Sequence, residues 1–230
     1  MIIVITGTSK GIGRYLAEKY LSEGHKVIGC SRGKTDLVHS DYAHYEVDVT
    51  NTEQIHAFAR AIRKQYKVVD VLINNAGAAS MNHCMTTPID TVEWLMKINF
   101  ISAFASSKEF FRMLRNSAHP RIVNFSTVAV PLKLEGEAAY VAAKGAIEAM
   151  TCSMAGELAA YGITVNAVGP CATHTDLTAK VPKEKMDKLL AKQKIHKYAD
   201  FADIKNVIDF YLSPNSDLIT GQIVYLGGVL

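Results

Sequence analysis

Tyr140 and Lys144 stand four residues apart in the stretch YVAAK, with only small apolar residues between them. Residues at i and i+4 of an α-helix project from the same face, so this spacing places a phenol beside an ammonium. The positive charge favours the phenolate and is expected to lower the pKa of Tyr140. A phenol tuned in this way can transfer a proton near neutral pH. The alternative interpretation of this pentapeptide alone is a surface helix that carries one tyrosine and one lysine.

A glycine-rich segment, TGTSKGIG (residues 6–13), lies between an apolar strand-like stretch and a helical pattern. Its glycines, Gly7, Gly11 and Gly13, have no Cβ and therefore permit a tight turn close to a phosphate. The free N–H groups and the positive dipole end of the following helix would face that phosphate. The spacing differs from G-x-G-x-x-G, but the strand–turn–helix arrangement is the same and predicts dinucleotide binding. The alternative is a purely structural turn.

The end of the second predicted strand indicates which dinucleotide is preferred. An acidic residue there would bind the 2′-hydroxyl of the adenosine ribose, whereas an arginine accommodates a 2′-phosphate. This chain has Ser31 and Arg32 and no acid, and Lys10 adds a positive charge in the glycine loop. A guanidinium is a strong forked donor to phosphate. The sequence therefore favours NADP(H) over NAD(H), unless Arg32 is an ordinary exposed residue.

Strand-like and helix-like segments alternate along the chain and predict one doubly wound α/β domain over residues 1–230, a Rossmann-like parallel sheet flanked by helices. The segment between Ser31 and His44 is short and polar, so we expect the helix between the second and third strands to be missing or reduced to a turn. Predicted strands are 2–6, 26–31, 44–49, 68–75, 121–127, 163–168 and 221–228, and predicted helices are 14–24, 52–66, 91–114 and 140–160.

Composition excludes several classes of function. A net charge of +3, without a basic run interleaved with aromatic residues, argues against nucleic-acid binding. The four cysteines and eight histidines are scattered without ligand spacing, which argues against a metal site and for free thiols in a reducing cytoplasm. The apolar stretch at the start, MIIVITG, is too short for a membrane span or a signal peptide.

Six motifs in order give the chain a resemblance to the short-chain dehydrogenase/reductase family, with ketoacyl-carrier-protein reductases and carbonyl reductases among the similar members. TGTSKGIG matches the TGxxxGxG cofactor loop, NNAG (74–77) the motif after the fourth strand, and YVAAK the YxxxK motif. The helix asparagine is Asn99 in KINF, VNAVGP (165–170) matches the stretch after the sixth strand, and ITGQIVYLGG (219–228) resembles the last strand.

The resemblance implies roles for these residues. Tyr140 would be the general acid/base, and Lys144 would lower its pKa while binding the nicotinamide ribose. Asn99 would hold a water molecule that links the lysine to solvent. Asp48 and Val49 would contact the adenine. The expected cofactor-binding residues are Gly7, Thr8, Ser9, Lys10, Gly11, Ile12, Gly13, Ser31, Arg32, Asp48, Val49, Asn75, Ala76, Gly77, Tyr140, Lys144, Pro170 and Thr173.

Two positions depart from the family pattern. The family serine lies thirteen residues before the tyrosine, which is Thr127 in this chain. Threonine keeps the hydroxyl, so Thr127 is expected to orient the substrate carbonyl; alternatively Ser126 takes this role, or the site is impaired. In GPCATHTDL (169–177), Cys171 replaces the usual glycine, and this segment would contact the nicotinamide carboxamide through its backbone and Thr173. Cys171 is expected to be a packed residue without a nucleophilic role.

Two segments indicate possible binding partners: the lysine-dense segment 180–197 and the alanine-rich helix after Tyr140. The lysines fit either a docking surface for an acyl-carrier protein or coenzyme A thioester, or a solvated amphipathic helix with Met186, Leu189 and Leu190 turned inward; the second is favoured. In the resembling family, the helices at 91–114 and 140–160 would pack across a dimer axis, which predicts a homodimer or homotetramer.

The sequence predicts an NADP(H)-dependent oxidoreductase that transfers a hydride between nicotinamide and a carbonyl or secondary alcohol substrate. A non-catalytic NADP(H)-binding scaffold or sensor is the alternative from another class, motivated by Thr127 and Cys171. A sugar-nucleotide epimerase or dehydratase is disfavoured, because the sequence offers no added substrate domain.

Overall fold

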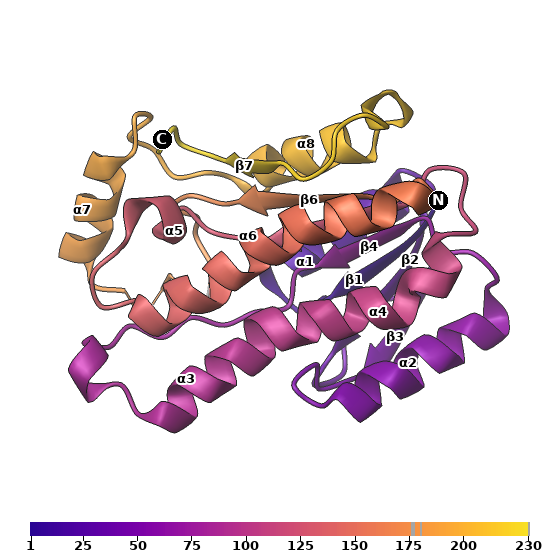
Figure 1. Cartoon of the computed structure of the whole chain (residues 1–230), viewed down its shortest axis with the longest axis horizontal. Helices are drawn as coiled ribbons and strands as arrows, with labels where there is room; N and C mark the ends of the chain where they lie inside the picture. Colours follow the sequence, from indigo (N-terminus) through magenta and orange to yellow (C-terminus); the bar gives the residue numbers. More distant parts are fainter. Residues whose placement is uncertain (176–177, 180, 230) are drawn as a thin grey trace.

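The computed structural model describes residues 1–175, 178–179 and 181–229. The end of the predicted segment 169–177 and the first residue of 180–197 therefore lie outside the described residues. Seven parallel strands of the described chain form one sheet in the order β3-β2-β1-β4-β5-β6-β7 (Figure 1). The strands are β1 (Ile2–Thr6), β2 (Lys26–Ser31), β3 (Tyr42–Glu46), β4 (Val71–Asn74), β5 (Arg121–Phe125), β6 (Thr164–Gly169) and β7 (Ile223–Tyr225).

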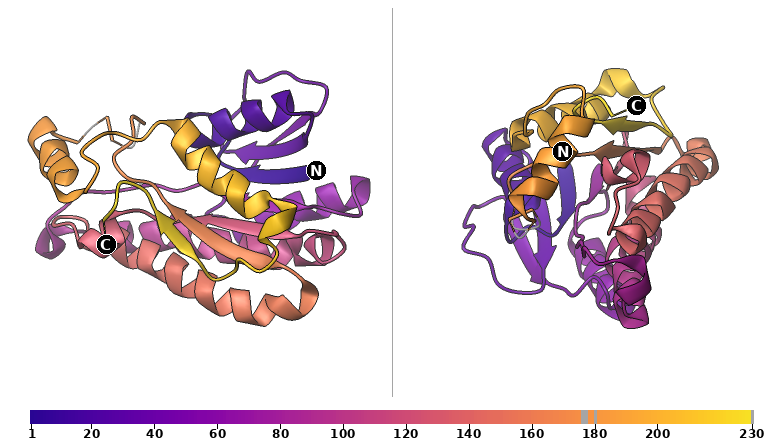
Figure 2. Two further views of the ribbon diagram at one scale, coloured as in Figure 1. Left: turned by 90° about the horizontal axis from the view of Figure 1, so that it is seen from above. Right: turned by 90° about the vertical axis from the view of Figure 1, so that its left-hand side faces the viewer.

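Helices cover both faces of the sheet. One core joins the sheet to α2, α4 and α6, and a second core joins its other face to α1 and α8. Figure 2 shows α1 and α8 side by side, and the rings of Tyr15 and Phe201 meet between them at 5.5 Å. The helices are α1 (Gly11–Ser22), α2 (Thr52–Gln65), α3 (Ile89–Met96), α4 (Ser102–Leu114), α5 (Ala129–Leu132), α6 (Ala138–Leu158), α7 (Lys183–Lys192) and α8 (Phe201–Leu212), with short turns η1 (Cys84–Thr86), η2 (Lys97–Ile101), η3 (Ala159–Tyr161) and η4 (Pro214–Ser216).

The sheet has the predicted doubly wound form because its inner strands are apolar on both faces. Ile3, Val4 and Ile5 of β1 are fully buried, and successive residues point into opposite cores. The chain runs outward from β1 to β3 and then returns to add β4 on the other side of β1. The carboxyl ends of β1 and β4 therefore flank the point at which the winding direction reverses, where ligands bind in such sheets.

Some strands are shorter than predicted, because residues at their ends do not pair with a neighbouring strand. The third strand spans 42–46 instead of 44–49, the fourth only 71–74, and the last only 223–225. The connection between β2 and β3 contains no helix among its residues, as expected. The prediction omitted α8, whose start was readable from sequence, since Asp200 and Asp203 form a capping box.

The predicted helix 91–114 is interrupted. It divides into α3 and α4 with a π-helical turn, η2, between them, and Asn99 is buried in that turn. Single π turns inside helices are frequently found at functional sites. In this turn the Asn99 amide donates to the Leu95 oxygen at 3.0 Å within the helix and to the Ala78 oxygen at 2.9 Å after β4. No helix of the described chain is long and apolar enough to cross a membrane.

Candidate active site

A cavity of about 450 Å³ opens at the carboxyl ends of the strands. Its walls come from the β1–α1 loop and the ends of β2, β4 and β5, together with α6 and the segment after β6. Nearly all of the residues predicted for the site line this one cavity: Gly7, Ser9, Lys10, Gly11, Ile12, Gly13, Ser31, Arg32, Asp48, Val49, Asn75, Ala76, Gly77, Asn99, Thr127, Tyr140, Lys144, Pro170 and Thr173.

Thr8 is the predicted site residue that does not line the cavity. Its side chain is fully buried, and its hydroxyl lies 2.9 Å from the hydroxyl of Tyr42 on β3. Gly29 leaves room for this pair, because a Cβ there would stand 2.3 Å from Thr8 Oγ1. A direct side-chain contact between Thr8 and a cofactor is therefore excluded in this geometry, and Thr8 supports the wall from behind.

The glycine loop is held tightly against the end of β4. Asn75 donates its amide to the carbonyl oxygens of Thr6, at 2.8 Å, and Gly7, at 3.1 Å. A Cβ on Gly13 would lie 2.2 Å from the Gly7 oxygen, so only glycine fits there, and Gly7 itself has a φ of 79°. The start of α1 has no side-chain cap, which leaves its N–H groups to face the cavity. This cradle fits a pyrophosphate group.

Ser126 and Thr127, the two candidate hydroxyls, point to different partners. Ser126 is buried, and its hydroxyl donates to the carboxylate of Glu148 on α6. Thr127 lines the cavity, and its hydrogen bond with Tyr140 lowers the pKa of that phenol. Both residues line the cavity, but the Ser126 hydroxyl is committed to Glu148, so the Thr127 hydroxyl is the one left available near Tyr140.

The net shift of the Tyr140 pKa is opposite to the expected one. Burial is the largest cause and raises the pKa of Tyr140, the nearby carboxylate of Glu137 raises it further, and the Thr127 bond only partly opposes them. Burial also lowers the pKa of Lys144 to about 8. The lowered pKa of Tyr140 that the helical spacing led us to expect was therefore wrong for the protein without cofactor. Spacing along a helix says nothing about how deeply the face of that helix is buried.

Lys144 and Asn99 approach each other across Gly77. Lys144 Nζ donates to the Phe125 carbonyl at 2.8 Å. The Asn99 amide donates to the Ala78 oxygen at 2.9 Å and accepts from the Ala78 nitrogen at 3.2 Å. A Cβ on Gly77 would lie 2.7 Å from Asn99 Oδ1 and 3.4 Å from Lys144 Nζ. The missing side chain thus keeps the floor of the cavity open to both groups.

Asp48 is both a lining residue and a turn residue. Its Oδ1 accepts from the nitrogen and the hydroxyl of Thr50 at 2.9 and 2.8 Å. The cap of α2 is instead Asn51, whose side chain accepts from Glu53 and Gln54. Asp48 is therefore a turn residue that lines the cavity without capping α2, and its contact with the adenine stays a prediction.

The segment after β6 closes the cavity on the side of Tyr140. Thr173 donates to the Cys171 carbonyl at 2.8 Å, and Cys171 is buried with a raised thiol pKa, caused mainly by burial. In α7, Met186 is buried, and Leu189 and Leu190 are half-buried. This arrangement agrees with the amphipathic helix favoured for the lysine-dense segment.

Sequence analysis missed two groups near the site. His44 lies beside Ser31. The alternation of side chains along a strand was an available signal, but it shows only that His44 shares a face with Tyr42. Glu148 follows Lys144 by one helical turn, a spacing that was available in the sequence. Three-residue groups of histidine, cysteine, aspartate or glutamate that could hold a metal ion are absent from the described residues.

Comparisons with known proteins agree with this architecture. A family model described as short chain dehydrogenase matches residues 1–186. The 3-oxoacyl-(acyl-carrier-protein) reductase of Vibrio cholerae is 32% identical over 99% of this chain and 96% of that protein, and the Escherichia coli reductase of the same name is 30% identical with the same coverage.

Solved structures are similar over almost the whole chain. The ligand-free aldohexose dehydrogenase of Thermoplasma acidophilum has a TM-score of 0.90 and 29% identity, covering 99% of this chain and 93% of that one. A 4-hydroxyisoleucine dehydrogenase complexed with NADH has a TM-score of 0.89 and 25% identity, covering 99% and 97%.

Proposed function

Because the chain belongs to the short chain dehydrogenases, we propose that it is an NADP(H)-dependent oxidoreductase that interconverts a carbonyl group and a secondary alcohol. The observation that supports this proposal best is the pair of hydroxyl-bearing side chains, Thr127 and Tyr140, that line the same cavity as the glycine loop. This pair offers two hydroxyls to one substrate oxygen, and the glycine loop offers N–H groups to a dinucleotide phosphate. The 30–32% identical relatives named as reductases support the same direction of chemistry.

In the proposed mechanism, a side chain of this protein supplies the proton that the substrate oxygen receives. The bound nicotinamide would supply the hydride that attacks the carbonyl carbon. Tyr140, whose raised pKa keeps the phenol protonated, donates its proton to the oxygen as negative charge develops there. Thr127 donates a hydrogen bond to the same oxygen. Lys144 and Asn99 would hold the ribose and return a proton to Tyr140 from solvent.

NADP(H) is proposed because Arg32 lines the cavity where the ribose 2′-position is expected and no acid stands beside it. A 4-hydroxyisoleucine dehydrogenase of similar fold is complexed with NADH, so the choice requires a direct comparison of the two cofactors.

For the substrate, the named relatives make a 3-ketoacyl thioester of an acyl-carrier protein or coenzyme A the first candidate. The exposed lysines of α7 support a carrier-protein partner, since they would attract an acidic surface. An aldohexose is the second candidate, because the similar structure of that dehydrogenase has 29% identity.

We further propose a cytoplasmic homo-oligomer. Cys30, Cys84, Cys152 and Cys171 are all unpaired, as expected in a reducing compartment. Ile101 and Phe104 are exposed next to each other at η2 and α4, which fits a subunit contact along this helix. A monomer mass, measured by size-exclusion chromatography with light scattering, would contradict this proposal.

The first experiment is the loss of NADPH or NADH absorbance over a panel of ketoacyl thioesters, ketones and diketones, and its gain with aldohexoses and oxidised cofactor. Turnover that disappears in Tyr140→Phe supports the proposal. Turnover that survives this substitution unchanged contradicts the mechanism. Tight cofactor binding without turnover on the whole panel favours the scaffold alternative.

A further inference from the structure

A single imidazole is bonded to both neighbours of Arg32. His44 Nε2 lies 2.9 Å from the Gly33 carbonyl oxygen and 3.2 Å from Ser31 Oγ. The Ser31 hydroxyl in turn donates to the same Gly33 oxygen at 2.8 Å. Arg32, between these two residues, is exposed and lines the cavity. The Gly33 backbone on one side of Arg32 is therefore bonded directly to His44 on the neighbouring strand, and Ser31 on the other side is bonded to the same ring through its hydroxyl.

The partners determine where the ring proton lies. A carbonyl oxygen can only accept, so Nε2 of His44 must carry the proton that reaches Gly33. In the neutral ring Nδ1 is then an acceptor, and it lies 2.9 Å from the hydroxyl of Tyr42. Tyr42 donates to Nδ1, and its oxygen accepts from Thr8, 2.9 Å away. The bonds form one directed chain from Thr8 to Gly33.

This chain connects two walls of the cavity. Thr8 belongs to the glycine loop, and its nitrogen donates to the Cys30 oxygen at 3.1 Å. Ser31, Arg32 and Gly33 form the adjacent wall, at the end of β2, which pairs with β1. Gly29 provides the space for the connection, since a Cβ there would stand 2.4 Å from the Tyr42 hydroxyl.

The Arg32 segment depends on such bonds because it contains no regular structure. Residues 32–41 form neither helix nor strand. Besides His44, Arg14 of α1 holds this segment, with Nη1 at 3.1 Å from Thr35 Oγ1 and ion pairs to Asp36 and Glu18. Arg14 acts further along the segment. Ser31 is also held by the pairing of β2 with β3, where its carbonyl accepts from the Val47 nitrogen at 2.8 Å, so Gly33, on the other side of Arg32, is the neighbour that depends on the bonds from His44 and Ser31.

We propose that His44 is a specificity-determining positioning residue, which fixes the Ser31–Gly33 backbone so that Arg32 faces the 2′-phosphate of the cofactor. This inference rests on the proposed preference for NADP(H). A guanidinium binds phosphate through a planar fork and therefore loses affinity when its backbone is released. His44 would contribute to the 2′-phosphate without touching it.

The test is titration calorimetry of the full chain with adenosine 2′,5′-bisphosphate and with adenosine 5′-monophosphate, which differ only in the 2′-phosphate. His44→Phe keeps a ring of similar shape and removes the bonds to Gly33, Ser31 and Tyr42. It is expected to weaken bisphosphate binding about fivefold to tenfold, the effect of one hydrogen bond, and monophosphate binding less than about twofold. His44→Gln, whose amide can donate to Gly33, is expected to restore part of the difference.

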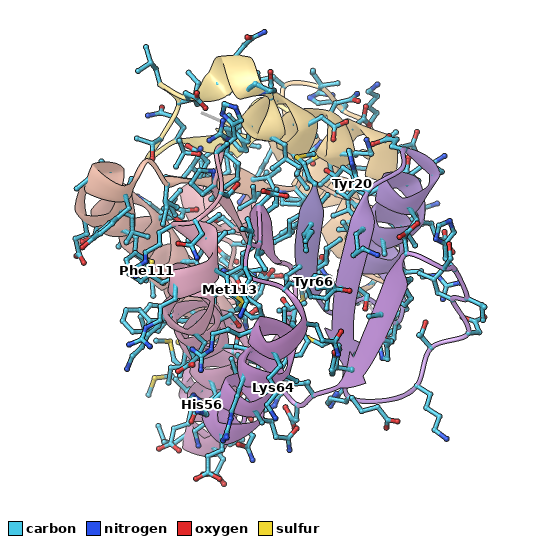
Figure 3. All side chains as sticks on the ribbon, turned by 90° about the vertical axis from the view of Figure 1, so that its right-hand side faces the viewer. Tyr20, His56, Lys64, Tyr66, Phe111 and Met113 are labelled. Carbon is cyan, nitrogen blue, oxygen red and sulfur yellow. The ribbon has the colours of Figure 1, made fainter. Side chains whose placement is uncertain are left out.

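The matched control is His56→Phe. Figure 3 shows His56 on α2, which covers the sheet face opposite to the one that Tyr42 packs against. Its ring bonds to Glu109 of α4, and binding of both ligands is expected to stay as in the wild type. Should His44→Phe not fold, Tyr42→Phe, which removes the hydroxyl that bonds His44 Nδ1 and Thr8, is expected to weaken bisphosphate binding selectively by about twofold.

Arg32→Ala separates the inference from the function on which it rests. If Arg32→Ala loses the preference for the bisphosphate and neither His44→Phe nor Tyr42→Phe does, the role of His44 is wrong and the choice of cofactor stands. Equal weakening of both ligands by His44→Phe also overturns the inference, since it indicates general damage to the site. A wild type that binds both ligands equally overturns the cofactor choice and the role of His44 together.

Discussion

The hydroxyl of Ser126 donates to the carboxylate of Glu148, one helical turn beyond Lys144 in α6. Tyr225 of β7 donates to the same Oε1 at 2.6 Å. Lys144 itself donates to Phe125, so two successive turns of α6 hold two successive residues at the end of β5. Thr127 is the next residue, and its position beside Tyr140 therefore follows from the anchoring of the residues before it.

Thr127 is expected to be the hydroxyl that the reaction needs. Thr127→Val keeps the branched shape and removes the donor, and we expect kcat of carbonyl reduction to fall about 100-fold, as for loss of one donor to a developing oxyanion. Thr127→Ser keeps the hydroxyl and is expected to retain activity within about threefold. Steady-state rates with saturating cofactor provide the measurement.

Ser126→Ala is the control for Thr127→Val. Its hydroxyl is committed to Glu148, so we expect kcat to change less than about threefold, while the melting temperature falls slightly because one buried bond is lost. If Ser126→Ala were the more damaging substitution for kcat, the assignment of the two hydroxyls would be reversed.

Glu137 is expected to shift the pH dependence of alcohol oxidation, in which Tyr140 must be a phenolate to accept the proton. The Glu137 carboxylate raises the pKa of Tyr140. Glu137→Gln removes this charge, so the rising limb of kcat/KM against pH should move to lower pH. Glu135→Gln changes an exposed carboxylate two residues away and should leave the limb in place. A limb that moves upward in Glu137→Gln contradicts the electrostatic argument.

Lys144 is expected to make stability depend on pH in the protein without cofactor. Burial lowers the pKa of its ammonium from 10.5 to about 8. Between these values the unfolded chain binds a proton that the folded chain has lost, so this group makes the free energy of unfolding rise with pH, by up to about 1.4 kcal/mol per unit. The contribution is lost as pH falls through about 8.

Lys144→Met removes the titrating group. Urea unfolding of both proteins from neutral pH upward should show the wild type gaining stability relative to Lys144→Met above about pH 8. A difference between the two proteins that stays constant across this range would show that Lys144 is not desolvated in the folded state.

Gly77→Ala is expected to disturb the floor of the cavity. The new methyl would stand 2.7 Å from Asn99 Oδ1 and must displace that side chain from Ala78. We expect kcat to fall about tenfold or more, since a small misplacement of catalytic groups has large effects. Gly156→Ala is the matched control, because no atom lies within 4 Å of its new methyl and α6 should gain up to about 1 kcal/mol. Equal activity of the two variants would contradict a role for this contact.

The sequence by itself determined the features that depend on neighbours along the chain. The β1–α1 glycine loop, the helix that carries Tyr140 and Lys144, and the parallel sheet follow from local spacing, from an apolar strand pattern and from the alternation of strands with helices. The order of the motifs was enough to indicate the family, which the match over residues 1–186 confirms. Strand ends were less well predicted, because they depend on where pairing with another strand stops.

Only the tertiary structure decided the features that depend on contacts between distant segments. Ser126 and Thr127 are equivalent by type, and it is Glu148 of α6 that commits the first and leaves the second for the site. His44 acquires its place beside Arg32 only when β3 pairs with β2. The direction of the Tyr140 pKa shift likewise follows mainly from burial, to which the Glu137 carboxylate adds. Solvation and hydrogen bonding are set by everything packed around a group, whereas spacing in sequence fixes only the face of the element on which the group lies.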